Sequence, residues 1–154
     1  MEYNLEGLER TADFGRSLAK NLKKGDVISL IGDLGAGKTT LTKSIAAFFG
    51  VDKEVTSPTF SLVNTYETDP VLNHMDLYRL EEEDEILSLD IDELLYPEGI
   101  TIIEWAEMAK TYMPRNLIEI YIDKTSQDSR RVRIEPDNKR QREIIEGLNE
   151  DFSD

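Results

Sequence analysis

The sequence contains no cysteine, only one histidine and one tryptophan, and no long apolar run. Without cysteine the chain forms neither a disulfide nor a thiolate metal site, a composition typical of a reducing compartment. Its start, MEYNLEGLER, carries acids where a secretory signal peptide would carry bases. No segment approaches the roughly 18 apolar residues that a membrane span needs. We therefore expect a cytoplasmic protein with no membrane contact.

Basic residues are also scarce, because 18 lysines and arginines stand against 32 acids, for a formal net charge of −14. This balance argues against extensive direct binding of RNA or anionic lipid. The charge is uneven, since residues 81–98 contain no base while bases crowd together later. Either stretch fits a solvated face or a docking surface for a protein partner. The later basic cluster consists of Arg130, Arg131, Arg133, Lys139, Arg140 and Arg142.

A chain of 154 residues has the usual size of one domain. We expect that domain over residues 1–150 and a disordered tail over residues 151–154. Apolar residues at helical spacing predict helices over 8–22, 38–49 and 137–149. Apolar or alternating stretches predict strands over 27–31, 60–66, 71–76, 100–105, 118–122 and 132–134. The predicted fold is α/β, a small mixed sheet with a parallel core and an antiparallel C-terminal hairpin, flanked by helices.

The stretch GDLGAGKT, residues 32–39, fits the phosphate-loop pattern G-x-x-x-x-G-K-[ST] between a predicted strand and a predicted helix. Its glycines let backbone N–H groups turn inward, and the helix adds its positive N-terminal end. Lys38 would reach the β and γ phosphates of a nucleotide, and the Thr39 hydroxyl would bind magnesium. The predicted nucleotide-binding residues here are Asp33, Leu34, Gly35, Ala36, Gly37, Lys38, Thr39 and Thr40.

A phosphate loop also needs a carboxylate on a neighbouring strand, to hold magnesium or to orient the attacking water. Asp76 ends the predicted strand VLNHMD and Glu104 ends ITIIE, so both fall at the carboxyl edge of the sheet, where such folds bind ligands. Apolar residues precede Glu104, whereas Asn73 and His74 interrupt the other strand, so strand quality favours Glu104. The segment TSPTF, residues 56–60, is either a plain turn or a switch that brings threonine hydroxyls toward the γ-phosphate.

In this order, GDLGAGKTT, TSPTF, HMDLYRL and IIEW closely resemble the TsaE (YjeE) family, the ATPase component of bacterial tRNA threonylcarbamoyladenosine synthesis. The resemblance runs from ERTADFGRSLA through RRVRI. It implies a P-loop ATPase in which Thr39 and Glu104 hold magnesium and Asp76 is needed for hydrolysis. It also implies that Thr11 and Val132 lie near the base or ribose of ATP.

The same resemblance implies action with TsaD and TsaB, with tRNA reached only through that assembly, and slow hydrolysis by the isolated chain. It further implies that Trp105 matters for activity. His74, Tyr78 and Arg79 then become supports or partner contacts, although a structural role for His74 is equally open. No arginine of the motifs is clearly placed as a finger, so Arg79 or a partner could supply one.

Other functions would use the same loop. A small-molecule kinase is the main alternative, although no lid domain fits the length of the chain. A GTPase is disfavoured because DNKR, residues 137–140, is followed by Gln141 where the guanine-reading pattern needs aspartate. A nucleotide-gated binding module that hydrolyses ATP negligibly also remains open.

Overall fold

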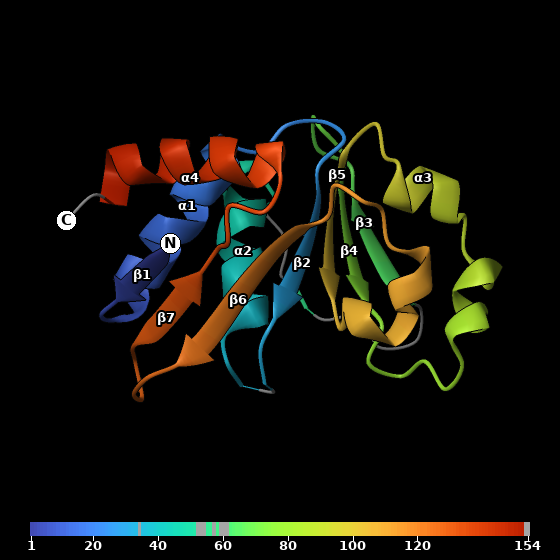
Figure 1. The fold of residues 1–154 in the computed structure, drawn as a ribbon, viewed down its shortest axis with the longest axis horizontal. Helices are drawn as coiled ribbons and strands as arrows, with labels where there is room; N and C mark the ends of the chain where they lie inside the picture. The colour runs from blue at the N-terminus through green and yellow to red at the C-terminus, as the bar shows by residue number, and fades with distance from the viewer. Residues whose placement is uncertain (34, 52–54, 57, 59–61, 153–154) are drawn as a thin grey trace.

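The computed structural model describes residues 1–33, 35–51, 55–56, 58 and 62–152. One mixed 7-stranded sheet runs through this part of the chain, with helices on both faces (Figure 1). The strands are β1 (Glu2–Leu5), β2 (Val27–Ile31), β3 (Val63–Tyr66), β4 (Leu72–Asp76), β5 (Ile100–Glu104), β6 (Ile118–Lys124) and β7 (Arg130–Arg133). The helices are α1 (Leu8–Lys20), α2 (Lys38–Phe48), η1 (Glu83–Ser88), α3 (Ile91–Leu95), η2 (Ala106–Tyr112) and α4 (Lys139–Phe152). None of these helices is both long and apolar enough to cross a bilayer.

The strands follow the order β1-β7-β6-β2-β5-β4-β3. The central strands are parallel, since β2 pairs in parallel with both β6 and β5, and β5 with β4. The outer pairs β1–β7, β6–β7 and β3–β4 are antiparallel. The predicted mixed sheet with a parallel core and a late hairpin is thus confirmed. Because β2 lies between β5 and β6, the loop that follows β2 is flanked by the carboxyl ends of both neighbours.

Each face of the sheet packs on its own hydrophobic core, because successive side chains of a strand point to opposite faces. Ile28 and Leu30 of β2 share one core with apolar residues of α1, α2 and α4. Val27 shares the other with Met75 and Ile103, covered by η1, α3 and η2. Figure 1 shows α1 and α4 toward the β1 end of the sheet and α3 toward the β3 end. Burial of the sheet on both faces holds the strand ends in place, and the ends of β4 and β5 carry the predicted site residues Asp76 and Glu104.

The structure differs from the sequence prediction at both ends of the chain. The strand β1 was not predicted, because an alternation of only Tyr3 and Leu5 is too short to stand out. The predicted tail boundary at residue 151 falls inside α4, which continues to Phe152. The Phe152 ring packs edge-on against Phe14, with ring centroids 5.5 Å apart. This contact extends the helix by one more turn than its apolar spacing indicated.

Candidate active site

The predicted phosphate loop joins the carboxyl end of β2 to the amino end of α2. Gly32 leaves no room for a side chain, because a Cβ there would lie 2.4 Å from the Ile122 carbonyl oxygen. Gly35 and Gly37 have φ values of 81° and 108°, in the region that glycine adopts without a steric penalty. Ala36, within the loop, is buried. The glycine pattern therefore builds the tight turn that a phosphate-binding backbone requires.

A cavity of about 250 Å³ opens beside this loop. It is smaller than the ~300–1,000 Å³ typical of pockets that enclose a whole small molecule, so it matches phosphates better than a complete nucleotide. Of the predicted loop residues, Asp33 is exposed outside the cavity and Leu34 lies outside the described residues. The described lining residues are Gly35, Gly37, Lys38, Thr39, Thr40, Asp76, Glu104, Trp105 and Arg130.

The predicted carboxylates meet at the end of the sheet. Asp76 and Glu104 are direct Cα partners in the parallel pairing of β4 with β5. The buried His74 places its Nε2 atom 2.6 Å from Oε2 of Glu104. The Tyr78 N–H donates a hydrogen bond of 3.0 Å to Oδ1 of Asp76. Residues of HMDLYR and IIEW therefore lie side by side at one site, and His74 contacts Glu104 directly.

Burial raises the pKa of Asp76 above its usual value, and the nearby Glu104 carboxylate raises it further. The Tyr78 hydrogen bond and the charge of Lys38 act in the opposite direction on this pKa. Two carboxylates so close together are stabilised by a cation, and oxygen donors of this kind suit magnesium. No cluster of three or more His, Asp or Glu exists in the described ranges that could hold a metal without help. The donor set therefore fits magnesium only with Thr39, water or nucleotide oxygens added, which is how proteins usually hold this ion.

Lys38 and Trp105 are in contact across the cavity. The Lys38 Nζ atom lies 4.0 Å from the centroid of the Trp105 ring, close enough for a cation–π interaction. The Tyr78 ring packs on Trp105, with the two ring centroids 5.0 Å apart. Trp105 has φ of 62°, an uncommon backbone conformation for a large residue that is found mainly at functional sites. The only tryptophan is thus a cavity residue as well as a packing residue.

Two predicted base or ribose contacts lie outside the phosphate cavity. Val132 is fully buried in β7 opposite Tyr3. The Thr11 hydroxyl is buried in α1 and has no hydrogen-bond partner among the described residues. Their place near the nucleotide stays a prediction. In the TSPTF segment, the Thr56 carbonyl accepts a hydrogen bond from Asn64, and Thr59 lies outside the described residues.

Sequence reasoning missed Arg130 as a member of this site. It also grouped Arg130 with bases that the structure separates. Arg140 forms a buried pair with Asp26 at 2.8 Å, and Arg133 pairs with the exposed Glu135. Arg140 is therefore not available to an exposed partner face, and a partner contact by the remaining bases stays a prediction. Arg79, the arginine considered for a finger, does not line the described cavity.

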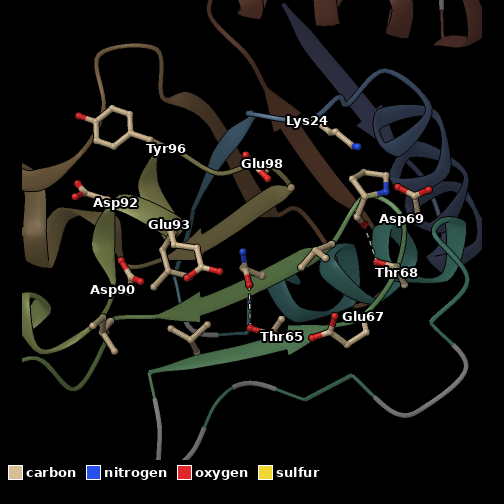
Figure 2. A pocket seen from close by; sticks show the side chains of 17 residues that line it. Lys24, Thr65, Glu67, Thr68, Asp69, Asp90, Asp92, Glu93, Tyr96 and Glu98 are labelled. Atoms are coloured by element: carbon tan, nitrogen blue, oxygen red, sulfur yellow. Dashed lines mark hydrogen bonds between the residues drawn. The ribbon is translucent and has the colours of Figure 1, made fainter.

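A larger cavity, of about 1000 Å³, lies at the amino ends of β4 and β5 beside α3 (Figure 2). Figure 2 shows carboxylates around its rim and a single base, Lys24. A nucleoside triphosphate would be repelled there, because its negative phosphates would face the negative carboxylates of the cavity. The smaller cavity at the loop, which Lys38 lines, therefore suits a nucleotide better. The carboxylates of the larger cavity belong to Glu67, Asp69, Asp90, Asp92, Glu93 and Glu98.

The stretch DNKR has a structural role in α4. The Asn138 N–H donates to Oε1 of Gln141, and the Gln141 N–H donates to Oδ1 of Asn138. These reciprocal bonds satisfy backbone donors at the start of the helix, as a capping box does. The stretch is therefore a helix start, which agrees with the absence of the guanine-reading aspartate.

A mixed β-sheet with a parallel core, a phosphate loop after its central strand and two carboxylates on neighbouring strand ends defines a P-loop nucleotide-binding protein. The chain belongs to the TsaE family, because the family model for "Threonylcarbamoyl adenosine biosynthesis protein TsaE" matches residues 5–132.

Individual relatives agree with this assignment. A Bacillus subtilis protein named tRNA threonylcarbamoyladenosine biosynthesis protein TsaE is 39% identical over 125 residues, covering 80% of this chain and 78% of the relative. A protein of that name from Nostoc is 40% identical over 137 residues, covering 84% and 82%. The crystal structure of Bacillus subtilis YdiB superposes with a TM-score of 0.83 at 30% identity, covering 98% of this chain and 95% of that one. The resemblance read from the motifs is confirmed, and the small-molecule kinase is not favoured.

Proposed function

We propose that this chain is a magnesium-dependent ATPase of the cytoplasm that acts in the threonylcarbamoylation of adenosine in tRNA. Membership of the TsaE family supports the pathway, since its relatives are named for tRNA threonylcarbamoyladenosine biosynthesis. The observation that carries the ATPase is the pairing of Asp76 with Glu104 in register, in a cavity shared with Lys38 and Thr39. This arrangement combines phosphate-binding, metal-binding and water-orienting groups at one point.

Each group has a distinct part in the proposed hydrolysis. Lys38 and the loop N–H groups would neutralise the transferring phosphoryl. Thr39 and Glu104 would hold magnesium, which supplies positive charge to the phosphate oxygens when bound. The Asp76 carboxylate would orient the attacking water and accept its proton. Its raised pKa favours that role, because a stronger base takes a proton more readily at neutral pH.

The proposed partners are TsaD and TsaB, which would make the only contact with tRNA. The net charge of −14 supports an indirect relation to RNA, because a strongly acidic surface repels a phosphodiester backbone. Arg79, the arginine predicted as a possible finger, does not line the cavity in the described residues. We therefore expect slow hydrolysis by the isolated chain and faster hydrolysis when the partners are present.

The test is ATP hydrolysis by the purified protein, alone and with TsaB, TsaD and tRNA. Lys38→Ala and Glu104→Gln should reduce the rate to background, since each removes a charge from the cavity. Lys43→Ala is the matched control, because Lys43 lies exposed on the same helix and does not line the cavity. Turnover that survives Lys38→Ala would refute the assignment. Nucleotide binding without turnover, even with partners, would instead establish a nucleotide-gated binding module.

A further inference from the structure

Arg130 reaches the phosphate loop from a strand that is not adjacent to it. It is the first residue of β7, which is separated from β2 by β6. A Cβ atom placed on Gly37 would lie 3.0 Å from the Arg130 Nε atom, so the guanidinium packs directly on the loop. The same side chain lines the cavity together with Lys38 and Glu104.

The turn between β6 and β7 holds this guanidinium by one edge. The Nη1 atom donates to the carbonyl oxygens of Ser126, Gln127 and Ser129 at 3.3, 3.4 and 3.0 Å. Within the described part of the chain, neither Nε nor Nη2 has a hydrogen bond of its own. An arginine offers five donors in a fixed plane, so anchoring one edge leaves the other edge for an acceptor.

The charge around Arg130 also sets it apart from its neighbours on the strand. Arg131 and Arg133 each face a carboxylate, Asp123 at 3.7 Å and Glu135 at 2.6 Å. No carboxylate lies within 4.0 Å of Arg130 in the described residues, although acids outnumber bases in this chain. A guanidinium without an anion, held against a phosphate loop, suits the bidentate binding of phosphate oxygens.

We propose that Arg130 is a phosphate-binding residue of the nucleotide site, supplied from β7 on the flank of the loop away from Asp76 and Glu104. Gly37 belongs to the part of such a loop that surrounds the α and β phosphates, so these are the phosphates that Arg130 contacts. The two flanks then divide their tasks, with carboxylates for the metal on the β5 side and a cation for the phosphates on the β6 side. This inference rests on the proposed nucleotide binding and adds a residue to it.

The experiment measures the affinity of the full chain for ATP, ADP and adenosine by calorimetry. Arg130→Gln should weaken ATP and ADP binding equally, by about tenfold or more, because it removes a charge-assisted hydrogen bond. Adenosine binding should not change, since adenosine has no phosphate. Arg130→Lys should give an intermediate loss, because it keeps the charge but not the planar fork. The matched control is Arg131→Gln, the next residue on the strand and already paired with Asp123.

The outcomes separate this inference from the proposed function. If the wild-type chain binds ATP and Arg130→Gln binds it equally well, Arg130 is not a phosphate ligand and the proposed function stands. Equal weakening by Arg131→Gln would overturn the contact in favour of a general effect of charge. A loss confined to ATP would overturn the assignment to the α and β phosphates. A wild-type chain that binds no nucleotide would overturn both proposals. Unfolding midpoints without nucleotide, compared across the variants, show whether any loss comes from misfolding.

Discussion

The Nε2 atom of His74 lies 2.6 Å from Oε2 of Glu104, and both side chains are buried. His74 belongs to β4 and Glu104 to the neighbouring β5, so this contact joins the two strands that carry the site. Side chains alternate along a strand, and His74 therefore shares a face with Asp76 two positions later. The histidine fixes one oxygen of the Glu104 carboxylate, which leaves the other available for the proposed magnesium ion.

Replacing His74 tests this support. His74→Phe leaves a buried carboxylate oxygen without its partner, and we expect a loss of about 1–3 kcal/mol in the free energy of unfolding. The variant should also bind magnesium–nucleotide more weakly, because the carboxylate is no longer held in one orientation. Denaturant unfolding and calorimetric titration measure the two effects. His74→Gln, which can still hydrogen-bond Glu104, should recover part of both losses. Unchanged magnesium affinity in His74→Phe would contradict the supporting role.

The raised pKa of Asp76 predicts a specific pH dependence of stability. Its pKa is 3.8 in the reference state and higher in the folded chain, so the folded state binds the proton more tightly. The contribution of Asp76 to stability therefore falls as pH rises from 3.8 through the folded pKa. Asp76→Asn should make the metal-free, nucleotide-free protein more stable than wild type at pH 7, with a smaller gain toward pH 4. Urea unfolding across that range measures the difference, and a variant less stable than wild type at pH 7 would contradict this prediction.

The only tryptophan provides a direct signal for the state of Lys38, the proposed phosphate ligand. Lys38 lies 4.0 Å from the Trp105 ring centroid, and phosphate binding would draw its ammonium toward the nucleotide. We therefore expect the tryptophan fluorescence to change on addition of magnesium–ATP. Lys38→Ala should alter the emission before any nucleotide is added and remove the further change. The same signal in Lys38→Ala as in wild type would show that the ring does not report on this contact.

Substitution of two glycines with positive φ, one inside the phosphate loop and one outside it, distinguishes an effect on nucleotide binding from an effect of backbone strain. Gly35 has φ of 81° and Gly50 has φ of 89°, and nothing lies within 4 Å of a Cβ built on either. Alanine at each position should cost about 1–2 kcal/mol of stability, because the left-handed conformation is strained for a residue with a side chain. Only Gly35→Ala should also weaken nucleotide binding, since Gly50 lies at the far end of α2. Chemical unfolding and nucleotide titration of both variants make the comparison, and equal affinities would place Gly35 outside the site.

The buried pair of Arg140 and Asp26 predicts a large effect on stability away from the site. The Nε and Nη2 atoms of Arg140 each lie 2.8 Å from an oxygen of Asp26, and their side chains are 14% and 6% exposed. Arg140→Met leaves Asp26 charged and unpaired, which should cost about 3–5 kcal/mol. Arg133→Met is the control, because its pair with Glu135 is exposed and should matter little. Denaturant midpoints decide between them, and similar midpoints would refute a structural role for the buried pair.

The sequence predicted what depends on contiguous residues. The phosphate loop could be placed because its glycines, Lys38 and Thr39 are adjacent in the chain and stand between a strand and a helix. The strand ends at Asp76 and Glu104 were also predictable, although Asn73 and His74 interrupt the apolar pattern before Asp76. That these two acids are direct partners was not, because one sequence does not give strand order or register.

The contacts that escaped prediction all join distant parts of the chain. Arg130 meets Gly37 only because β7 pairs with β6 and β6 with β2. The contact of His74 with Glu104 likewise depends on β4 lying beside β5. The helix α4 continues beyond its predicted end because Phe152 packs against Phe14, a residue near the other end of the chain. Local sequence propensity does not predict these long-range contacts, because they form only when the sheet has assembled.

The parallel pairing of β4 with β5 also determines which parts of the chain are open to redesign. Backbone hydrogen bonds between these strands set the spacing of Asp76 and Glu104, whatever path the chain takes from one to the other. The acidic segment with η1 and α3 forms that path and contributes no described residue to the phosphate cavity. Its length and charge can therefore diverge among relatives, or be altered by an engineer, without disturbing the chemical centre, provided that its apolar anchors still cover the sheet.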